Sequence, residues 1–370
     1  MKTLKIILVI LLIFSTTFLF ANNDYPKKNT IKVALLLDTS NSMDGLINQA
    51  KTQLWEIVNE LSYAKCEHED PNLEIALYEY GNDNLSSREG YIRQVLGFSS
   101  DLDEISEKLF ALRTNGGNEF CGEVIQTSLK QLDWGNRKND LKLIFIAGNE
   151  PFTQGNVHYK DAASLANEEG VVVNTIFCGN YQTGIHGKWQ DGARLTNGDY
   201  MAIDQNEAIV HISSPYDQEI IILNKKLNDT YIYYGSQGAS KLRLQSKQDS
   251  NAETLDEVVV VKRAVSKSSR VYKNSSWDLV DAENDKGFSY DKLNKKNLPK
   301  DLQGKSTEEV KKYVAKQRSK RKEIQARINE LNKKRTVYVA KKQSENNSKS
   351  LDKAMIEAIK KQAKRKNYTW

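Results

Sequence analysis

The sequence is poor in the residues that hold small disulfide-rich or zinc-binding folds together. Three cysteines, Cys66, Cys121 and Cys178, and four histidines lie scattered among 370 residues. Three cysteines are too few for a disulfide scaffold, and their spacing matches no zinc motif. If any bridge forms in an oxidising compartment, we expect it between Cys121 and Cys178, because Cys66 should lie at the opposite end of the fold. Two separate buried thiols are the alternative to that bridge.

The sequence also lacks the short motifs of common hydrolases and nucleotide-binding proteins. It contains no G-x-S-x-G, no H-E-x-x-H and no glycine-rich phosphate loop that ends in Lys-Ser or Lys-Thr. We therefore expect that the protein is not an enzyme. Metal-assisted hydrolysis is the less favoured alternative, because no motif supports it.

Only one apolar run approaches the length of a membrane span, and it lies at the start of the chain. Lys2 and Lys5 precede apolar residues from 6 to 21, and the chain then turns polar. This pattern predicts a signal peptide over residues 1–21, although Leu19 is unusual three residues before the cleavage point. An uncleaved membrane anchor is the alternative. We expect an exported protein that resides in the periplasm, at the cell surface or in the medium.

The most informative stretch is an apolar run at residues 31–37 that ends in Asp38, with Ser40 and Ser42 at alternate positions after it. A run this apolar is typical of a strand buried on both faces at the centre of a parallel sheet. The polar residues then lie at the carboxyl end of the strand, where open α/β sheets bind ligands. Three hard oxygen donors suit a cation such as Mg²⁺. A turn that only caps the next helix is the alternative interpretation.

From residue 29 to residue 212, apolar runs alternate with helical patterns. Residues 141–147 and 171–178 are further continuous apolar runs, and apolar residues between 46 and 61 recur at helical spacing. Such alternation predicts an α/β fold with a doubly wound, mostly parallel, Rossmann-like sheet.

The string D-x-S-x-S-M between a buried strand and an amphipathic helix resembles the metal-ion-dependent adhesion site of von Willebrand factor type A (VWA) domains. The resemblance implies that a second loop supplies a threonine and a third loop an aspartate. Here the second loop, 114–119, has Asn118 in the place of that threonine and Glu119 next to it. The third loop, 147–151, lacks the aspartate and contains Glu150.

We therefore predict a divergent metal site and a function based on binding. The predicted ligands of Mg²⁺, or of Mn²⁺ or Ca²⁺, are Asp38, Ser40 and Ser42, helped by Asn118 or Glu119 and by Glu150. The resemblance implies that a carboxylate of a protein partner fills the open position of the ion, in adhesion or complex assembly. The alternative is a metal-free VWA platform that binds an anionic envelope surface through its C-terminal helices. Nucleic acid is a poor candidate partner for an exported protein.

Beyond the predicted VWA domain, residues 213–300 are expected to form a helical and irregular connecting region. Residues 218–228 have a helical pattern, and a capping box at Ser250 is expected to open a buried, valine-rich helix. A second capping box, Ser306-Thr307-Glu308-Glu309, predicts the start of a long helix that ends near Gln343.

The last segment, residues 301–370, is expected to be a basic helical hairpin. Its long helix has a coiled-coil-like seam with polar interruptions (Val310, Val314, Gln317, Arg321, Ile324, Ile328, Leu331, Arg335 and Tyr338), which should pack against Leu351, Met355 and Ile359 of a shorter helix. The segment has 21 Lys and Arg against 8 Asp and Glu, a net charge of +13. Such an excess favours contact with an anionic lipid or polysaccharide, unless the lysines only keep the helices soluble.

Overall fold

The computed structural model describes residues 28–204, 212–343 and 351–370, so the predicted signal peptide at residues 1–21 lies outside the described residues. Its centre is a sheet of six strands in the order β4-β3-β1-β5-β6-β7, in which only β4 is antiparallel to its neighbour. The strands are β1 (Thr30–Asp38), β3 (Asn72–Tyr80), β4 (Ile92–Ser99), β5 (Leu141–Gly148), β6 (Val172–Cys178) and β7 (Tyr200–Ile203). The predicted α/β fold with a mostly parallel sheet is confirmed.

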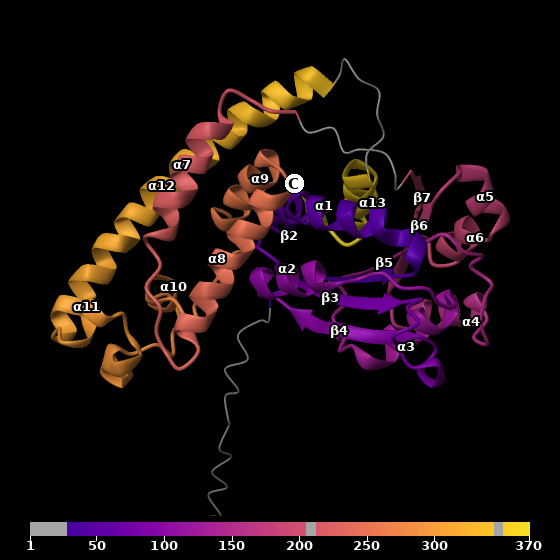
Figure 1. The fold of residues 1–370 in the computed structure, drawn as a ribbon, viewed down its shortest axis with the longest axis horizontal. Coiled ribbons are helices and arrows are strands. Elements are labelled where there is room, and N and C mark those ends of the chain that lie inside the picture. Colours follow the sequence, from indigo (N-terminus) through magenta and orange to yellow (C-terminus); the bar gives the residue numbers. More distant parts are fainter. Residues whose placement is uncertain (1–27, 205–211, 344–350) are drawn as a thin grey trace, which may run out of the picture.

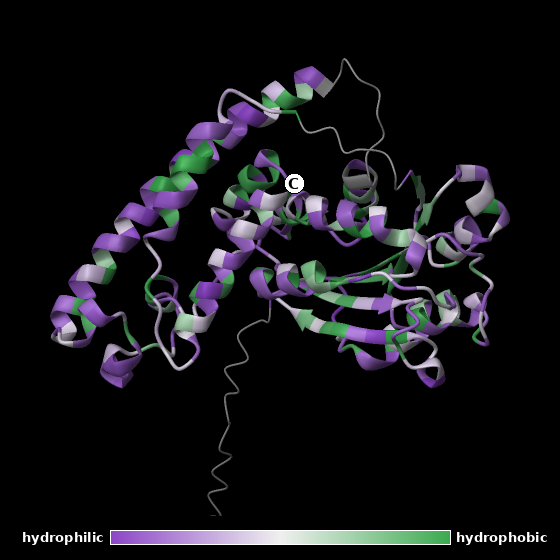
Figure 2. Ribbon diagram, viewed as in Figure 1, coloured by the Kyte–Doolittle hydropathy of each residue, from purple (hydrophilic) through white to green (hydrophobic). Residues whose placement is uncertain are grey.

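Helices cover both faces of this sheet (Figure 1), and β1 contributes alternate residues to each layer. Val33 and Leu37 belong to the apolar cluster under α1 and α2, whereas Ala34 and Leu36 belong to the cluster under α3 and α4. Figure 2 shows the hydrophobic colour concentrated on the central strands and on the inward faces of the helices. The helices of these layers are α1 (Asp44–Ser62), α2 (Leu102–Ala111), α3 (Cys121–Gln131), α4 (Tyr159–Glu168), α5 (Tyr181–His186) and α6 (Trp189–Arg194).

A helical region follows β7 and lies beside the sheet domain, on the side of α1 and α2 (Figure 1). Helix α8 packs on α2, α9 packs on α1, and α12 forms the outer layer against α7, α9 and α10. The helices of this region are α7 (Asp217–Asn228), α8 (Gly238–Leu255), α9 (Glu257–Lys267), α10 (Leu279–Ala282), α11 (Lys300–Gln303) and α12 (Thr307–Gln343). Among the residues that the structure describes, none of the helices combines the length and the apolar character that a membrane span requires.

The ends of these helices show where local sequence signals decide the structure. Before α12, the Ser306 backbone amide donates to Glu309 Oε2 at 2.8 Å and the Glu309 amide donates to Ser306 Oγ at 3.3 Å, so the predicted capping box is confirmed. The capping box expected at Ser250 is wrong, because α8 continues through this residue to Leu255. Asp256 caps the valine-rich helix α9 instead, by accepting from the Val258 amide at 2.7 Å.

The predicted seam of α12 is buried, but the prediction that the shorter C-terminal helix covers it is wrong. Val314, Ile328 and Leu331 are at most 2% exposed, and α12 packs on α7, α9 and α10 instead of on the shorter C-terminal helix, α13 (Leu351–Lys364). Two polar residues of the seam explain why α12 packs on these helices. Arg321 donates to Asp278 at 2.6 Å, and Arg335 donates to Asp217 on α7 at 3.0 Å.

Helix α13 (Leu351–Lys364) belongs to the sheet domain, so residues 301–370 are not a hairpin. It packs on α1 and β7, and Met355 borders the apolar space between α1 and the sheet; the Leu351 side chain lies outside the described residues. The last strand, β8 (Tyr368–Thr369), pairs with β2 (Lys65–Cys66). The sheet domain is therefore discontinuous, and the helices α7 to α12 lie between its strand β7 and its last helix.

Buried ion pairs attach this helical region to the sheet domain. Arg263 on α9 is fully buried and binds Asp103 on α2 at 2.9 Å and Asp249 on α8. The Arg263 guanidinium also lies 4.8 Å from the ring centre of Trp55 on α1. Removing one partner of a buried pair costs about 3–5 kcal/mol because the other charge stays buried. This network therefore fixes α8 and α9 against α1 and α2.

The docking of α13 can be tested through Gln362, which exchanges hydrogen bonds with Asn174 on β6 and is 3% exposed. We expect Gln362→Ala to lower the free energy of unfolding by about 1–3 kcal/mol, since it leaves the buried Asn174 amide without its partner. A double-mutant cycle with Asn174→Ala, measured by urea unfolding, should give a coupling energy of about 0.5–3 kcal/mol. A cycle of Gln362→Ala with Lys322→Ala on α12 is the control and should give none. The absence of coupling between positions 174 and 362 would contradict the docking.

Candidate metal centre

The loop that leaves β1 curls so that its polar side chains lie together. The Ser40 amide donates to Asp38 Oδ1 at 2.7 Å, and the Met43 amide donates to the Ser40 carbonyl at 3.0 Å. These bonds lead into a short 3₁₀ turn and then into α1. The hydroxyl oxygens of Ser40 and Ser42 are 3.4 Å apart. The structure thus brings the three predicted residues of the first loop together.

A second carboxyl group, that of Glu119, lies beside Asp38. Asp38 is 0% and Glu119 is 4% exposed, and a Cβ placed on Gly81 would lie 2.8 Å from both Asp38 Oδ1 and Glu119 Cγ. Burial, and then the neighbouring Glu119 carboxyl, raise the pKa of Asp38 well above its usual range. Two carboxyl groups this close cannot both stay charged unless a cation lies beside them. Without a cation, they must share a proton.

Glycines allow this close approach of the loops. Gly81 has φ +75°, a conformation that other residues rarely adopt, and any side chain there would meet the Asp38 carboxyl group and the Cγ methylene of Glu119. A Cβ on Gly148, at the end of β5, would lie 3.2 Å from Asp38 Oδ2 and 2.5 Å from Tyr80 Oη. The third loop can therefore pass next to Asp38 only with glycine at this position.

The third loop brings Asn149 to the site and turns Glu150 away from it. Asn149 Nδ2 donates to Ser42 Oγ at 3.0 Å, whereas the exposed Glu150 accepts from Gln154 Nε2 at 3.0 Å. Asn118, on the second loop, is exposed. Of the predicted helper residues, the structure therefore brings only Glu119 next to Asp38, and it adds Asn149, which sequence reasoning did not select.

Three buried oxygens of this site have no hydrogen-bond partner within the described residues: Asp38 Oδ2, Glu119 Oε2 and Asn149 Oδ1. Leaving such an atom unpaired costs about 1–3 kcal/mol, and more when the group is charged. A hard cation would satisfy all three, because carboxylate and amide oxygens are its preferred ligands. Among residues 28–204, 212–343 and 351–370, no group of three or more His, Cys, Asp or Glu side chains could hold a metal, here or elsewhere, so an ion at this site would also need the serine and asparagine oxygens.

The thiols near the site are buried and protonated. Cys121 Sγ lies 3.8 Å from Tyr80 Oη, and Tyr80 in turn donates to the Ala147 carbonyl at 2.9 Å. Burial, with the nearby carboxyl groups of Asp38 and Glu119, raises the pKa of both Cys121 and Cys178 well above the usual thiol range. All three cysteines are free thiols in the structure, and Cys66 lies at the opposite end of β1, as expected.

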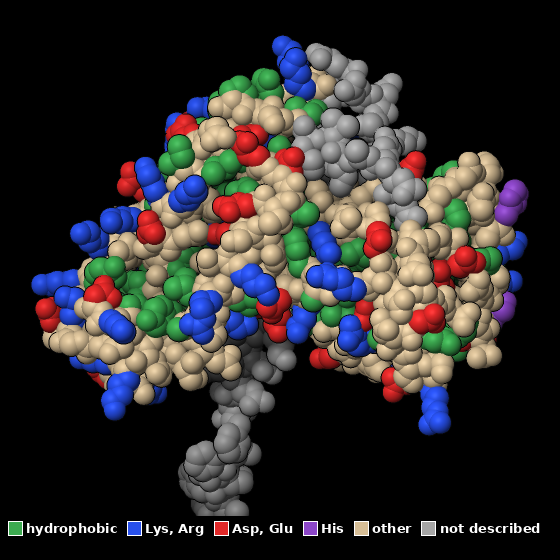
Figure 3. Space-filling view, in the orientation of Figure 1, with side chains coloured by type: hydrophobic (Ala, Val, Ile, Leu, Met, Phe, Trp, Pro, Cys, Tyr) green, Lys and Arg blue, Asp and Glu red, His purple; other side chains and the backbone are tan. Residues whose placement is uncertain are grey.

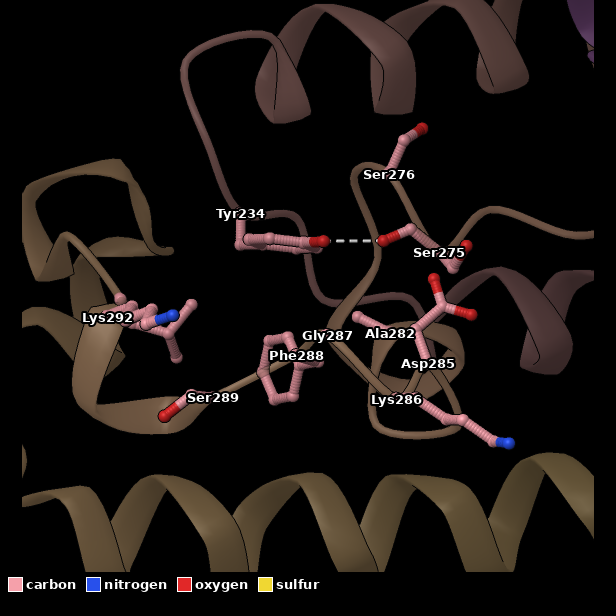
Figure 4. A pocket seen from close by; sticks show the side chains of 11 residues that line it. Tyr234, Ser275, Ser276, Ala282, Asp285, Lys286, Gly287, Phe288, Ser289 and Lys292 are labelled. Atoms are coloured by element: carbon pink, nitrogen blue, oxygen red, sulfur yellow. Dashed lines mark hydrogen bonds between the residues drawn. The ribbon is translucent and has the colours of Figure 1, made fainter. Parts of the chain in front are cut away.

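A pocket lies far from this site, in the helical region. It has a volume of about 620 Å³, and Figure 4 shows Phe288 near its centre, with the Tyr234 hydroxyl donating to the Ser275 carbonyl. Nothing in its lining matches a predicted site residue. The lining residues are Tyr234, Ser275, Ser276, Ala282, Asp285, Lys286, Gly287, Phe288, Ser289, Lys292 and Leu293.

Fold and site together define a class: a doubly wound α/β domain with an oxygen-rich loop at the carboxyl edge of its central strand. Residues 32–184 match the family model of the von Willebrand factor type A domain. The chain therefore contains a VWA domain, as the resemblance of the D-x-S-x-S string implied.

Several solved structures are similar to the chain at low sequence identity. The conserved hypothetical protein BatB from Bacteroides thetaiotaomicron is 16% identical, with a TM-score of 0.37 over 47% of this chain and 90% of that chain. The SpRpn10 VWA domain is 16% identical, with a TM-score of 0.34 over 47% of this chain and 87% of that chain. Proximal thread matrix protein 1 from the mussel byssus, with a zinc-occupied MIDAS motif, is 13% identical, with a TM-score of 0.34 over 49% of this chain and 43% of that chain. A comparison with curated proteins found no match.

The pair of buried carboxyl groups can be tested in the absence of metal. In a chelator at neutral pH, we expect Glu119→Gln to raise the free energy of unfolding by about 1 kcal/mol or more, since it replaces one of two adjacent buried carboxyl groups, which cannot both carry a charge, by a neutral amide. Added Mg²⁺ should stabilise the wild type and have little effect on the variant. The matched control is Glu150→Gln, which should behave as the wild type in both conditions. Destabilisation by Glu119→Gln in chelator would contradict repulsion between the two groups.

Proposed function

We propose that the protein is a binding module that engages a protein partner through a divalent cation at the carboxyl edge of β1. The observation that carries this proposal is the set of buried oxygens of Asp38, Glu119 and Asn149 that have no partner within the described residues. VWA domains commonly mediate protein–protein interactions. A partner would have to reach a cation held here from the side where the three loops meet.

The residues of this chain would hold the ion by their side-chain oxygens. Asp38 and Glu119 supply the negative charge, and Ser40 and Ser42, already 3.4 Å apart, supply neutral oxygens. Mg²⁺ suits such a set because it takes few protein carboxylates and keeps open positions, with Mn²⁺ or Ca²⁺ as the alternatives. The bound ion supplies a Lewis-acidic open position for an oxygen of the partner, which the resemblance implies to be a carboxylate.

We further propose that this module acts outside the cytoplasm and performs no catalysis. The proposal of export rests on the basic and apolar pattern of residues 1–21. For the absence of catalysis, the support is that the Cys121 and Cys178 thiols, which lie near the site, are buried and protonated and so are not poised as nucleophiles.

Metal binding is tested directly by calorimetric titration of the protein with Mg²⁺ and Mn²⁺. We expect a single binding event in the wild type and its loss in Asp38→Ala, because this substitution removes one of the two carboxyl groups and its buried oxygens. Glu150→Gln is the control and should bind with unchanged affinity, since its side chain is exposed and bonded to Gln154. No heat with either metal at millimolar concentration would refute the proposal.

A second candidate function is attachment to an anionic membrane through α12. Figure 3 shows Lys and Arg side chains spread over the part of the surface that α11 and α12 form. Some of these charges are paired, such as Arg318 with Glu283 at 2.6 Å. Others are exposed and form no ion pair with any residue that the structure describes: Lys312, Lys316, Lys322 and Lys333. Each basic residue near an anionic membrane contributes about 1 kcal/mol.

The membrane contact is tested by sedimentation with vesicles that contain phosphatidylglycerol. Replacing Lys312, Lys316, Lys322 and Lys333 by Gln should weaken binding at least tenfold, and added salt should weaken the wild type because screening shortens the reach of these charges to about 8 Å. The charge-matched control replaces four exposed lysines of the VWA domain, Lys130, Lys138, Lys160 and Lys188, and should keep most of the binding. Deletion of residues 301–370 is unsuitable, because it removes α13 from the sheet domain. Equal losses in both variants would show that α12 has no special role.

A further inference from the structure

The pocket in the helical region combines apolar surface with hydroxyl groups. Its volume of about 620 Å³ lies within the range of pockets that enclose a small ligand or a side chain of a partner. Two half-buried aromatic rings, those of Tyr234 and Phe288, line it with their centres 5.9 Å apart. Ala282 and Leu293 add apolar surface, and Ser276 stands exposed at its edge. An apolar side chain can therefore enter the pocket while the main chain that carries it stays near polar groups.

The two rings are held in place by the residues around them, so the pocket is formed before anything binds. The Tyr234 amide donates to the Trp277 carbonyl at 2.8 Å, and the Phe288 amide donates to the Asp285 carbonyl at 3.0 Å. The Phe288 ring also packs edge-on against Tyr290, with ring centres 5.0 Å apart. A site that is already ordered loses little conformational entropy on binding.

Positive charge surrounds this apolar surface. Figure 4 shows Lys292 on one side of the Phe288 ring and Lys286 on the other, and Asp285 is the one acid among the lining residues. The Lys292 side chain forms no ion pair or hydrogen bond with any residue that the structure describes. The stretch 284–300 as a whole has five Lys against two Asp, a net charge of +3. A field of this sign favours an acidic partner over a basic one.

The polar groups of the pocket suit a peptide better than a sugar. A sugar requires several free hydrogen-bonding groups around its ring. Here the Tyr234 hydroxyl donates to the Ser275 carbonyl, and the Ser289 hydroxyl accepts from the Asp291 amide at 3.3 Å. The unoccupied features are thus the apolar surface and the lysines, which match an apolar side chain and carboxylates.

We propose that this pocket binds an acidic peptide segment of a protein partner, with one apolar side chain of the peptide against Phe288 and its carboxylates beside Lys292 and Lys286. The buried side chain would anchor the complex, and the charges around it would select the partner. The pocket shares no residue with the candidate metal centre. It would therefore give the protein a second place for binding a partner, independent of the cation.

The experiment measures, by calorimetry, how the full chain binds the acetylated and amidated peptide Asp-Asp-Phe-Asp-Asp. A chelator is present, so that the peptide carboxylates cannot bind a metal ion at the end of β1. We expect the affinity to fall at least tenfold when alanine replaces the phenylalanine of the peptide, because the anchor is lost. The peptide Lys-Lys-Phe-Lys-Lys should not bind, because its charges have the wrong sign.

Variants of the protein test whether the peptide occupies this pocket. Phe288→Ala should weaken binding at least tenfold, and its control Ile222→Ala removes an exposed apolar side chain of α7 that lies outside the pocket and should have no effect. Lys292→Gln should weaken binding at least threefold, whereas Lys296→Gln removes the same charge from the same stretch outside the pocket and should stay within twofold of the wild type. Ser276→Asp adds a negative charge at an exposed position and should weaken binding at least threefold.

The outcomes keep this proposal separate from the proposed metal site. Asp38→Ala should bind the peptide as the wild type does. If Phe288→Ala lowers the thermal midpoint, Lys292→Gln and Ser276→Asp decide, since both positions are exposed. Unchanged binding in these two variants, or equal binding of the alanine peptide, would overturn the proposal. So would a wild type that binds no peptide at millimolar concentration, and loss of binding to phosphatidylglycerol vesicles in Phe288→Ala would then assign the pocket to a lipid.

Discussion

The structure depends on one costly arrangement: two carboxyl groups, those of Asp38 and Glu119, buried side by side at the end of the central strand. Burial alone disfavours each charge, and proximity disfavours the pair further, which is why the pKa of Asp38 is raised so far. The surrounding fold holds them there. Strand β1 lies between β3 and β5, and glycine at positions 81 and 148 lets the neighbouring loops approach to contact distance. An arrangement of this kind persists when a cation neutralises the charges or when the two carboxyl groups share a proton.

Helix α1 links this site to the rest of the molecule. It begins directly after the D-x-S-x-S loop, and both α9 of the helical region and α13 pack on it. The contact with α9 is polar and specific: Asn59 on α1 accepts from Ser266 and donates to the Lys262 carbonyl at 2.9 Å. The helical region therefore packs on the sheet domain on the side of the helix that leaves the site. The apolar seam of α12 is used up in this packing, so a partner would meet its outer side, where lysine and arginine predominate.

Most patterns within one element were interpreted correctly from the sequence, with the capping box expected at Ser250 as an exception, whereas contacts between distant elements were not. The buried strands, the ends of α12 and the grouping of Asp38, Ser40 and Ser42 follow from consecutive residues, because strand burial, capping and turn formation are local. The partner of the α12 seam was predicted wrongly, since periodicity shows which face is apolar and not what covers it. Arg321 and Arg335 were the available signal, because a buried arginine requires an acidic partner, and these two bind Asp278 and Asp217. The choice between Asn149 and Glu150 depended on one turn after β5, whose direction no sequence pattern gives.

A VWA domain that served only as a metal-free structural platform would not need two buried carboxyl groups at this site. Replacing buried charged groups by well-packed neutral residues is often neutral or stabilising by about 1–4 kcal/mol, so a domain that served only as a platform would gain by losing Asp38 and Glu119. Instead the chain keeps both acids, leaves an oxygen of each without a protein partner, and places the Ser40 and Ser42 hydroxyls next to them. Carboxyl, hydroxyl and amide oxygens are the ligand types that a hard cation prefers. The cost of burying these charges is therefore best explained by an ion that offsets it when bound.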